Sequence, residues 1–143
     1  MLFFVLAFVP RKTIQKLFWF SLVWGVGLDT ALILLFKSLN FYYYVNAEPF
    51  EYLGSPFFIN LAWAPAVILF FHFLPERKER YVLPVYIACY ALLGTYIGVF
   101  LSKAGLIVDV NWNGLYRFPV VYLCFYACHK HYQYLKANDP DSI

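Results

Sequence analysis

The sequence predicts an all-α membrane protein, built as a polytopic bundle of transmembrane helices. Of its 143 residues, 63% are hydrophobic and only 13% are charged, and its mean hydropathy is +0.64. Ordinary soluble domains carry about 25% charged and about 45–50% apolar residues, so this composition cannot supply a solvated surface. Apolar runs about as long as a bilayer-crossing helix are the second observation. These runs and their loops use the whole chain, which predicts a single transmembrane domain over residues 1–143.

Four runs have the length of transmembrane helices, and they cover residues 17–36, 57–74, 81–101 and 112–128. As a helix, the first run would reach about 30 Å, which is the hydrocarbon thickness of a bilayer. Pro65 lies inside the second run and predicts a kink near residues 60–61, which a bilayer tolerates because neighbouring helices satisfy the freed carbonyl. The apolar residues after Lys103 would lengthen or tilt the third run.

Residues 1–10 form a shorter apolar segment that ends at Pro10, before Arg11 and Lys12. This segment would be about 15 Å long as a helix, which is half a bilayer. It lacks a basic start and a small-residue cleavage site, so we expect no cleaved signal peptide. Three interpretations remain open: a short or re-entrant first helix, an in-plane anchor, or the end of a span that begins upstream. We favour the short first helix.

Basic residues divide unevenly between the two ends of the predicted helices. Eight lie at one set of ends (Arg11, Lys12, Lys16, Arg77, Lys78, Arg80, Lys130 and Lys136) and three at the other (Lys37, Lys103 and Arg117). Cytoplasmic loops of membrane proteins are enriched in Lys and Arg. The split therefore predicts a cytoplasmic C-terminus and a cytoplasmic turn at residues 75–80, with residues 37–56 and 102–111 outside.

Charge and cysteine usage exclude several other classes of protein. The net charge of +3 comes from small basic groups beside apolar runs, so we expect no nucleic-acid partner. Cys124, Cys128 and His131 share a helix face, but they extend over about 10.5 Å along it. One tetrahedral ion, with bonds of about 2 Å, does not span that length, and a buried cysteine also behaves as a small apolar residue. We therefore expect no metal site and no cofactor.

Two stripes of small residues recur at every fourth position. Ser21 and Gly25 lie on the first run, and Gly94 and Gly98 lie on the third. Small residues at this spacing let two helix backbones approach closely, and the predicted topology makes these two helices parallel. Packing of the two stripes on each other, self-association between two copies, and chance occurrence of glycine all remain open.

Asp29 and Arg117 are charged residues deep inside predicted spans. Each lies about 4 Å outward of the middle of its run, where a charge costs roughly 2.5–3.5 kcal/mol to insert. We expect the two residues to face each other within the bundle, with Asn60 and Thr95 as polar neighbours. Such a pair would either fix helix register or line a pocket open to the outer leaflet. In that pocket Arg117 would meet an anionic head group or Asp29 would take a proton.

A resemblance to a known family rests on short patterns along the chain. They are the apolar lead ending in Pro10-Arg11-Lys12, GLDT at 27–30, NLAWAP at 60–65 and NWNGLYRFP at 111–119. Together they resemble a family of small, uncharacterised multi-pass membrane proteins of spore-forming bacteria. The resemblance implies a multi-pass protein of the bacterial inner membrane, and it brings no activity or site residues with it.

Two functional hypotheses follow. The first is a non-enzymatic binding, sensing or accessory subunit that lies in the lipid bilayer and associates with itself or with a membrane protein partner. The alternative is a small membrane enzyme or carrier for a lipid-like or isoprenoid substrate. Enzymes use two or more groups in matched acid and base roles, and few ionisable groups lie within the predicted spans, which favours the first hypothesis.

Overall fold

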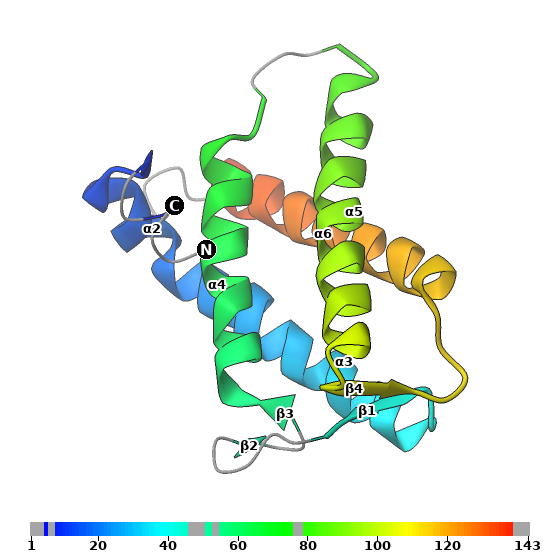
Figure 1. Ribbon diagram of the computed structural model, residues 1–143. Helices are drawn as coiled ribbons and strands as arrows, with labels where there is room; N and C mark the ends of the chain where they lie inside the picture. Colours follow the sequence, from blue (N-terminus) through cyan, green and yellow to red (C-terminus); the bar gives the residue numbers. More distant parts are fainter. Residues whose placement is uncertain (1–4, 6–7, 46–50, 53–54, 76–78, 139–143) are drawn as a thin grey trace.

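The computed structural model describes residues 5, 8–45, 51–52, 55–75 and 79–138, and this part of the chain is mostly helical (Figure 1). Its helices are α2 (Arg11–Ser21), α3 (Leu28–Ser38), α4 (Phe57–His72), α5 (Val82–Lys103) and α6 (Gly114–Asn138). A π-helical segment over Leu22–Gly27 joins α2 to α3, so that residues 11–38 form one continuous helix. The short helix expected over residues 1–10 lies mostly outside the described residues.

All four predicted runs are helical, although their ends differ from the prediction. The first helix begins at Arg11 rather than at residue 17, and α6 continues to Asn138 instead of ending near residue 128. No Gly or Pro interrupts the sequence between residues 120 and 138, and Tyr132 stacks on Phe71 of α4 with ring centroids 4.3 Å apart. Both facts favour the longer helix. Two helices, 11–38 and 82–103, are long and apolar enough to cross a membrane, and α4 is apolar but shorter.

Two short antiparallel sheets connect the helices at one end of the molecule. Strand β1 (Tyr42–Tyr44) pairs with β4 (Ile107–Asp109), and β2 (Glu51–Tyr52) pairs with β3 (Ser55–Pro56). The sequence suggested that the apolar residues after Lys103 would lengthen or tilt the third helix. They do not lengthen it, because they form strand β4 instead. The helix ends at Lys103 and the chain turns at Gly105, whose φ of 76° suits glycine, before β4 begins.

The helices pack in pairs around an aromatic core. In Figure 1, α4 and α5 stand upright, while the helix 11–38 and α6 cross behind them at an angle. The fully buried Phe70 lies at the centre, with the Tyr86, Tyr90 and Phe125 rings of α5 and α6 at centroid distances of 5.0–5.2 Å. Aromatic rings in tilted and edge-to-face contact add to the apolar burial that holds helices together.

The small-residue stripes mark close helix approaches, but they do not pack on each other as one interpretation proposed. A Cβ atom on Gly25 would lie 2.7 Å from the Ala64 backbone nitrogen, so the stripe with the buried Ser21 lies against α4. A Cβ on Gly94 would lie 2.9 Å from the Trp63 ring and 3.0 Å from Val121, and Gly98 lies against Arg117. Each stripe thus has its own partner, because bulky side chains of α4 and α6 fill the space beside α5.

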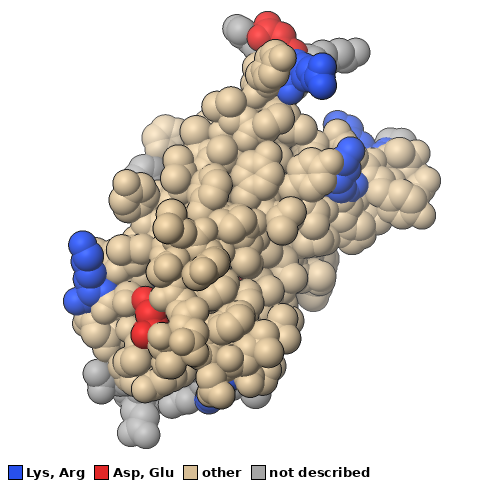
Figure 2. All heavy atoms as spheres, turned by 90° about the vertical axis from the view of Figure 1, so that its right-hand side faces the viewer, with Lys and Arg blue, Asp and Glu red and all other residues tan. Residues whose placement is uncertain are grey.

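The surface carries large apolar side chains on every helix. Among the most exposed are Trp19 (74%), Val23 (63%), Tyr96 (71%), Phe100 (70%), Leu115 (84%) and Leu123 (62%). Figure 2 shows a face whose middle is free of charged side chains, with Lys, Arg, Asp and Glu gathered towards its edges. Large apolar side chains exposed in this number, on every helix, are unusual on a soluble monomer.

Candidate functional site

The start of α6 directs Arg117 into the protein. Asn113 caps the helix, since its Oδ1 accepts the Leu115 N–H at 3.0 Å and the Tyr116 N–H at 3.1 Å. The capped turn places Arg117 one turn further on, where it is buried. Gly98 of α5 leaves room for it, because a Cβ there would lie 2.7 Å from Arg117 Cδ.

The ion-pair partner of Arg117 is Asp109, so Arg117 and Asp29 do not form the ion pair that one of the two interpretations proposed. Arg117 Nη2 donates to Asp109 Oδ1 at 2.9 Å. Strand β4 ends at Asp109, directly opposite Tyr42 in β1, and the guanidinium carbon lies 5.6 Å from the centre of the Tyr42 ring. The strand thus brings a carboxylate to the guanidinium from outside the helices, and a cation–π contact adds to that pair.

Asp29 lies in the first turn of α3 and has no counter-charge in the described part of the chain. Its Oδ2 is buried and, among the described residues, has no hydrogen-bond partner. The polar neighbours that the sequence suggested form bonds elsewhere. Asn60 donates to the Thr30 hydroxyl at 3.4 Å, and Thr95 donates to the Ala91 carbonyl of its own helix at 2.8 Å.

Asp29 and Arg117 nevertheless line one cavity, of about 80 Å³, which we call the strand cavity. Its other notable walls are the aromatic side chains of Phe36, Tyr42, Tyr44, Trp63 and Trp112. Trp112 Nε1 is buried and, within the described residues, also lacks a hydrogen-bond partner. Burial raises the pKa of Tyr42 and of Tyr44 above the ordinary value of a phenol, and the Asp29 carboxylate adds to this rise in both. Both phenols therefore remain neutral hydrogen-bond donors at physiological pH.

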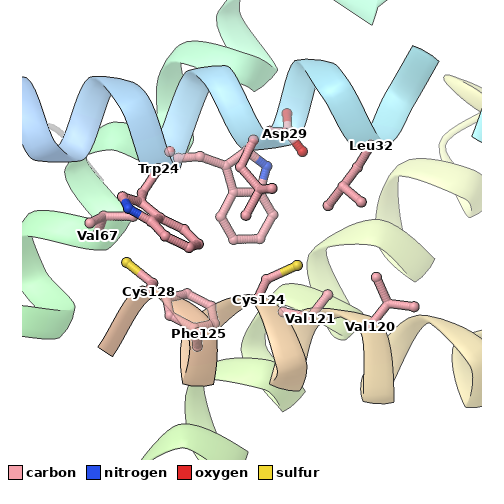
Figure 3. Close-up of a pocket in the computed structure, with 12 residues that line it drawn as sticks. Trp24, Asp29, Leu32, Val67, Val120, Val121, Cys124, Phe125 and Cys128 are labelled. Atoms are coloured by element: carbon pink, nitrogen blue, oxygen red, sulfur yellow. The ribbon is translucent and has the colours of Figure 1, made fainter. Parts of the chain in front are cut away.

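A second cavity, of about 70 Å³, lies between the helix 11–38 and α6, and we call it the thiol cavity. Figure 3 shows Cys124 and Cys128 on the α6 side, with Trp24 and Asp29 on the helix opposite. Its remaining walls are largely apolar, among them Val67 of α4. Asp29 therefore belongs to both cavities.

The cysteine and histidine residues of α6 do not converge on one point. His131 Nδ1 accepts the Trp24 Nε1–H at 2.8 Å, whereas Cys124 and Cys128 are free thiols facing the thiol cavity. His129 is buried, and its ring nitrogens have no hydrogen-bond partner in the part of the chain described here. Among those residues no three His, Cys, Asp or Glu side chains are placed to hold a metal ion.

Asp109, Tyr42 and Trp112 are site residues that the sequence argument missed. A signal for two of them was present: FYYYV at 41–45 and LIVDV at 106–110 are rich in aromatic and β-branched residues, which is typical of strands. Pairing these two segments brings Asp109 and Tyr42 to the start of α6. Trp112 stacks on Phe41, with ring centroids 5.2 Å apart.

Comparison of this chain with protein-family models, with curated proteins and with solved structures found no match. Its function is therefore inferred from its residues and their geometry.

Proposed function

We propose that the protein is a multi-pass integral membrane protein that binds a small ligand in the strand cavity, as a binding, sensing or accessory subunit rather than an enzyme. In this proposal all four helices cross the bacterial inner membrane, the C-terminus is cytoplasmic and the β1–β4 sheet lies outside. The apolar exposure of every helix supports this setting. The most apolar stretches of helices 11–38 and 82–103 have only 28% and 17% of their residues buried, whereas the core helix of a soluble protein is apolar because it is buried.

One observation carries the binding function: two residues that line the same cavity each hold a buried polar atom without a hydrogen-bond partner among the described residues. These atoms are the acceptor Asp29 Oδ2 and the donor Trp112 Nε1. Burying an unpaired polar group costs about 1–3 kcal/mol, and a charged group costs more. Proteins keep such groups where a ligand, an ion or water completes them. We infer that a ligand in the strand cavity supplies the missing hydrogen-bond partners.

The chemistry of the cavity favours binding over catalysis. Nucleophilic or acid–base catalysis needs a reacting group within hydrogen-bond reach of a base. Arg117 is held by Asp109, and among the described residues Asp29 contacts no nucleophile or base through a hydrogen bond. The Cys124 and Cys128 thiols face a largely apolar cavity, which favours the protonated thiol over the nucleophilic thiolate.

Cysteine labelling tests the membrane setting. In a protein whose three cysteines are replaced by Ala, single cysteines are introduced at Ser55 and at Ser142. We expect a membrane-impermeant maleimide to label the Ser55→Cys variant in intact cells and the Ser142→Cys variant only after permeabilisation. The reverse pattern would show an inverted orientation, and recovery of the parent in the soluble fraction would contradict the membrane setting.

Native mass spectrometry of the purified protein tests the binding function. We expect the parent to retain a bound small molecule that the Asp29→Asn variant lacks. Glu79→Gln is the matched control, because it removes the same charge from an exposed residue, and it should keep the bound molecule. Parent protein that carries no bound molecule would contradict ligand binding.

A further inference from the structure

The strand cavity contains one acidic side chain that no basic side chain of the described residues balances. Arg117 contributes one positive charge, and the Asp109 carboxylate at 2.9 Å balances it. Asp29 is then an acidic side chain without a counter-charge in the described residues, and its Oδ2 accepts no hydrogen bond there. A ligand that carries one positive charge and a donor group would stabilise the ionised form of Asp29 and complete the hydrogen bond in one step.

The walls of the strand cavity suit an organic cation better than a metal ion. The rings of Tyr42, Tyr44, Trp63 and Trp112 line the same cavity as Asp29. Aromatic faces attract ammonium groups, and a ring-lined pocket is a common way to recognise them. Ca²⁺ and Mg²⁺ instead need about six or more oxygen ligands, which one carboxylate and two neutral phenols do not provide.

The position of Asp29 between the two cavities adds a requirement on the shape of the ligand. The strand cavity and the thiol cavity share Asp29, Leu32, Trp63, Val120 and Val121 as walls. Beyond this shared wall the thiol cavity is bounded mainly by apolar side chains, with Cys124 and Phe125 on α6 (Figure 3). A positive head group beside Asp29 would thus lie next to the apolar walls of the thiol cavity, which suit an apolar tail.

We infer that the ligand is an alkylammonium ion, with its head group in the strand cavity against Asp29 and a short apolar tail in the thiol cavity. The inference rests on the proposed binding function and names its ligand class. An anionic ligand at Arg117 is less favoured by the geometry, because Asp109 and the Tyr42 ring already occupy the guanidinium. The two cavities, of about 80 and 70 Å³, limit the tail to a few carbon atoms.

Titration with three probes of equal length tests the charge requirement. Butylammonium, butanol and butanoate are added separately to the full-length protein in nanodiscs of zwitterionic lipid, and binding is followed by calorimetry. We expect saturable binding of butylammonium. The Asp29→Asn variant should weaken it by about tenfold to a hundredfold, which is the loss expected for a charge-assisted hydrogen bond, and Glu79→Gln should leave it unchanged.

A second variant tests the position of the tail. Cys124 lines the thiol cavity but not the strand cavity, so Cys124→Phe should fill the space for the tail. We expect this variant to weaken butylammonium binding and to leave methylammonium binding unchanged. Equal loss for both amines would overturn the placement of the tail.

A protection experiment covers the case in which Asp29→Asn does not fold. Cys89 and Cys128 are replaced by Ala, Asp29 is kept, and the rate of Cys124 alkylation by N-ethylmaleimide is measured. We expect butylammonium to slow this reaction, while butanol and butanoate have no effect. An unchanged rate with butylammonium would contradict its place in the thiol cavity.

The outcomes separate this inference from the proposed function. If butanoate binds more strongly than butylammonium, the ligand lies on Arg117. If butanol binds as strongly as butylammonium, charge has no role in binding. Either result overturns the inference that the ligand is a cation, while the proposed binding function stands. If no probe binds while native mass spectrometry finds a retained molecule, only the ligand class is wrong. If no probe binds and the purified protein is empty, both proposals fail.

Discussion

The close approach of the first helix to α4 makes Gly25→Ala a sharp test of the packing. A Cβ atom on Gly25 would lie 2.7–2.8 Å from the backbone of Ala64 and Trp63. Carbon atoms in good contact lie about 3.5–4.0 Å apart, so the two helices would have to separate by roughly 0.7 Å or more. Backbone atoms cannot rotate away as a side chain can. We therefore expect Gly25→Ala to destabilise the protein.

Gly27 supplies the matched control, because it lies in the same π-helical segment and is exposed. A Cβ on Gly27 would meet only the Leu22 carbonyl oxygen, at 3.8 Å, which is ordinary contact. Both alanine variants gain up to about 1 kcal/mol of helix propensity, whereas overpacking at Gly25 costs about 1–3 kcal/mol. The difference in stability between the two variants therefore measures the clash alone, and we expect about 1–3 kcal/mol in favour of Gly27→Ala.

Unfolding of the two purified variants with increasing SDS in mixed micelles, followed by tryptophan fluorescence and circular dichroism, gives this difference. A control for topology is that both variants insert into the membrane at the level of the parent. If Gly25→Ala is as stable as Gly27→Ala or more stable, the close packing of the helix 11–38 on α4 is refuted.

Two further predictions use the same unfolding assay. Asp109→Asn and Arg117→Gln should each lower the free energy of unfolding by roughly 1–3 kcal/mol, because each leaves a partner unpaired. The double variant should lose less than the sum of the two single losses. Additive losses, or recovery of stability when the charges of Asp29 and Arg117 are exchanged, would contradict the Asp109–Arg117 pair. Trp24→Phe should lower the free energy of unfolding by about 0.5–1.5 kcal/mol through loss of its hydrogen bond to His131. Adding His131→Leu to the Trp24→Phe variant should lower it little further. A second loss as large as the first would show that the two side chains act independently.

Helices were predictable from this sequence, but the contacts between distant residues were not. Each apolar run is helical because its length and composition leave few alternatives. The partner of Arg117 depends on the pairing of Tyr42 with Asp109 across two short strands, which no local pattern specifies. The choice of α4 as the neighbour of Gly25 likewise depends on which bulky residues occupy the remaining space. The sequence therefore indicated Asp29 and Arg117 as candidate site residues, while their contacts could be described only from the structure.

The π-helical segment sets the direction in which Asp29 points. The Leu28 N–H bonds to the Val23 carbonyl five residues earlier, so this part of the helix turns less per residue than the roughly 100° of an α-helix. The residues after it are rotated about the helix axis relative to a regular helix, and Asp29 is the second of them. If the segment Leu22–Gly27 adopted α-helical hydrogen bonds without losing a residue, the carboxylate would turn by roughly 100° relative to α2, away from both cavities, whereas deletion of one residue would largely restore its direction. The hydrogen-bond pattern of a segment without any charged residue thus determines whether Asp29 faces the two cavities.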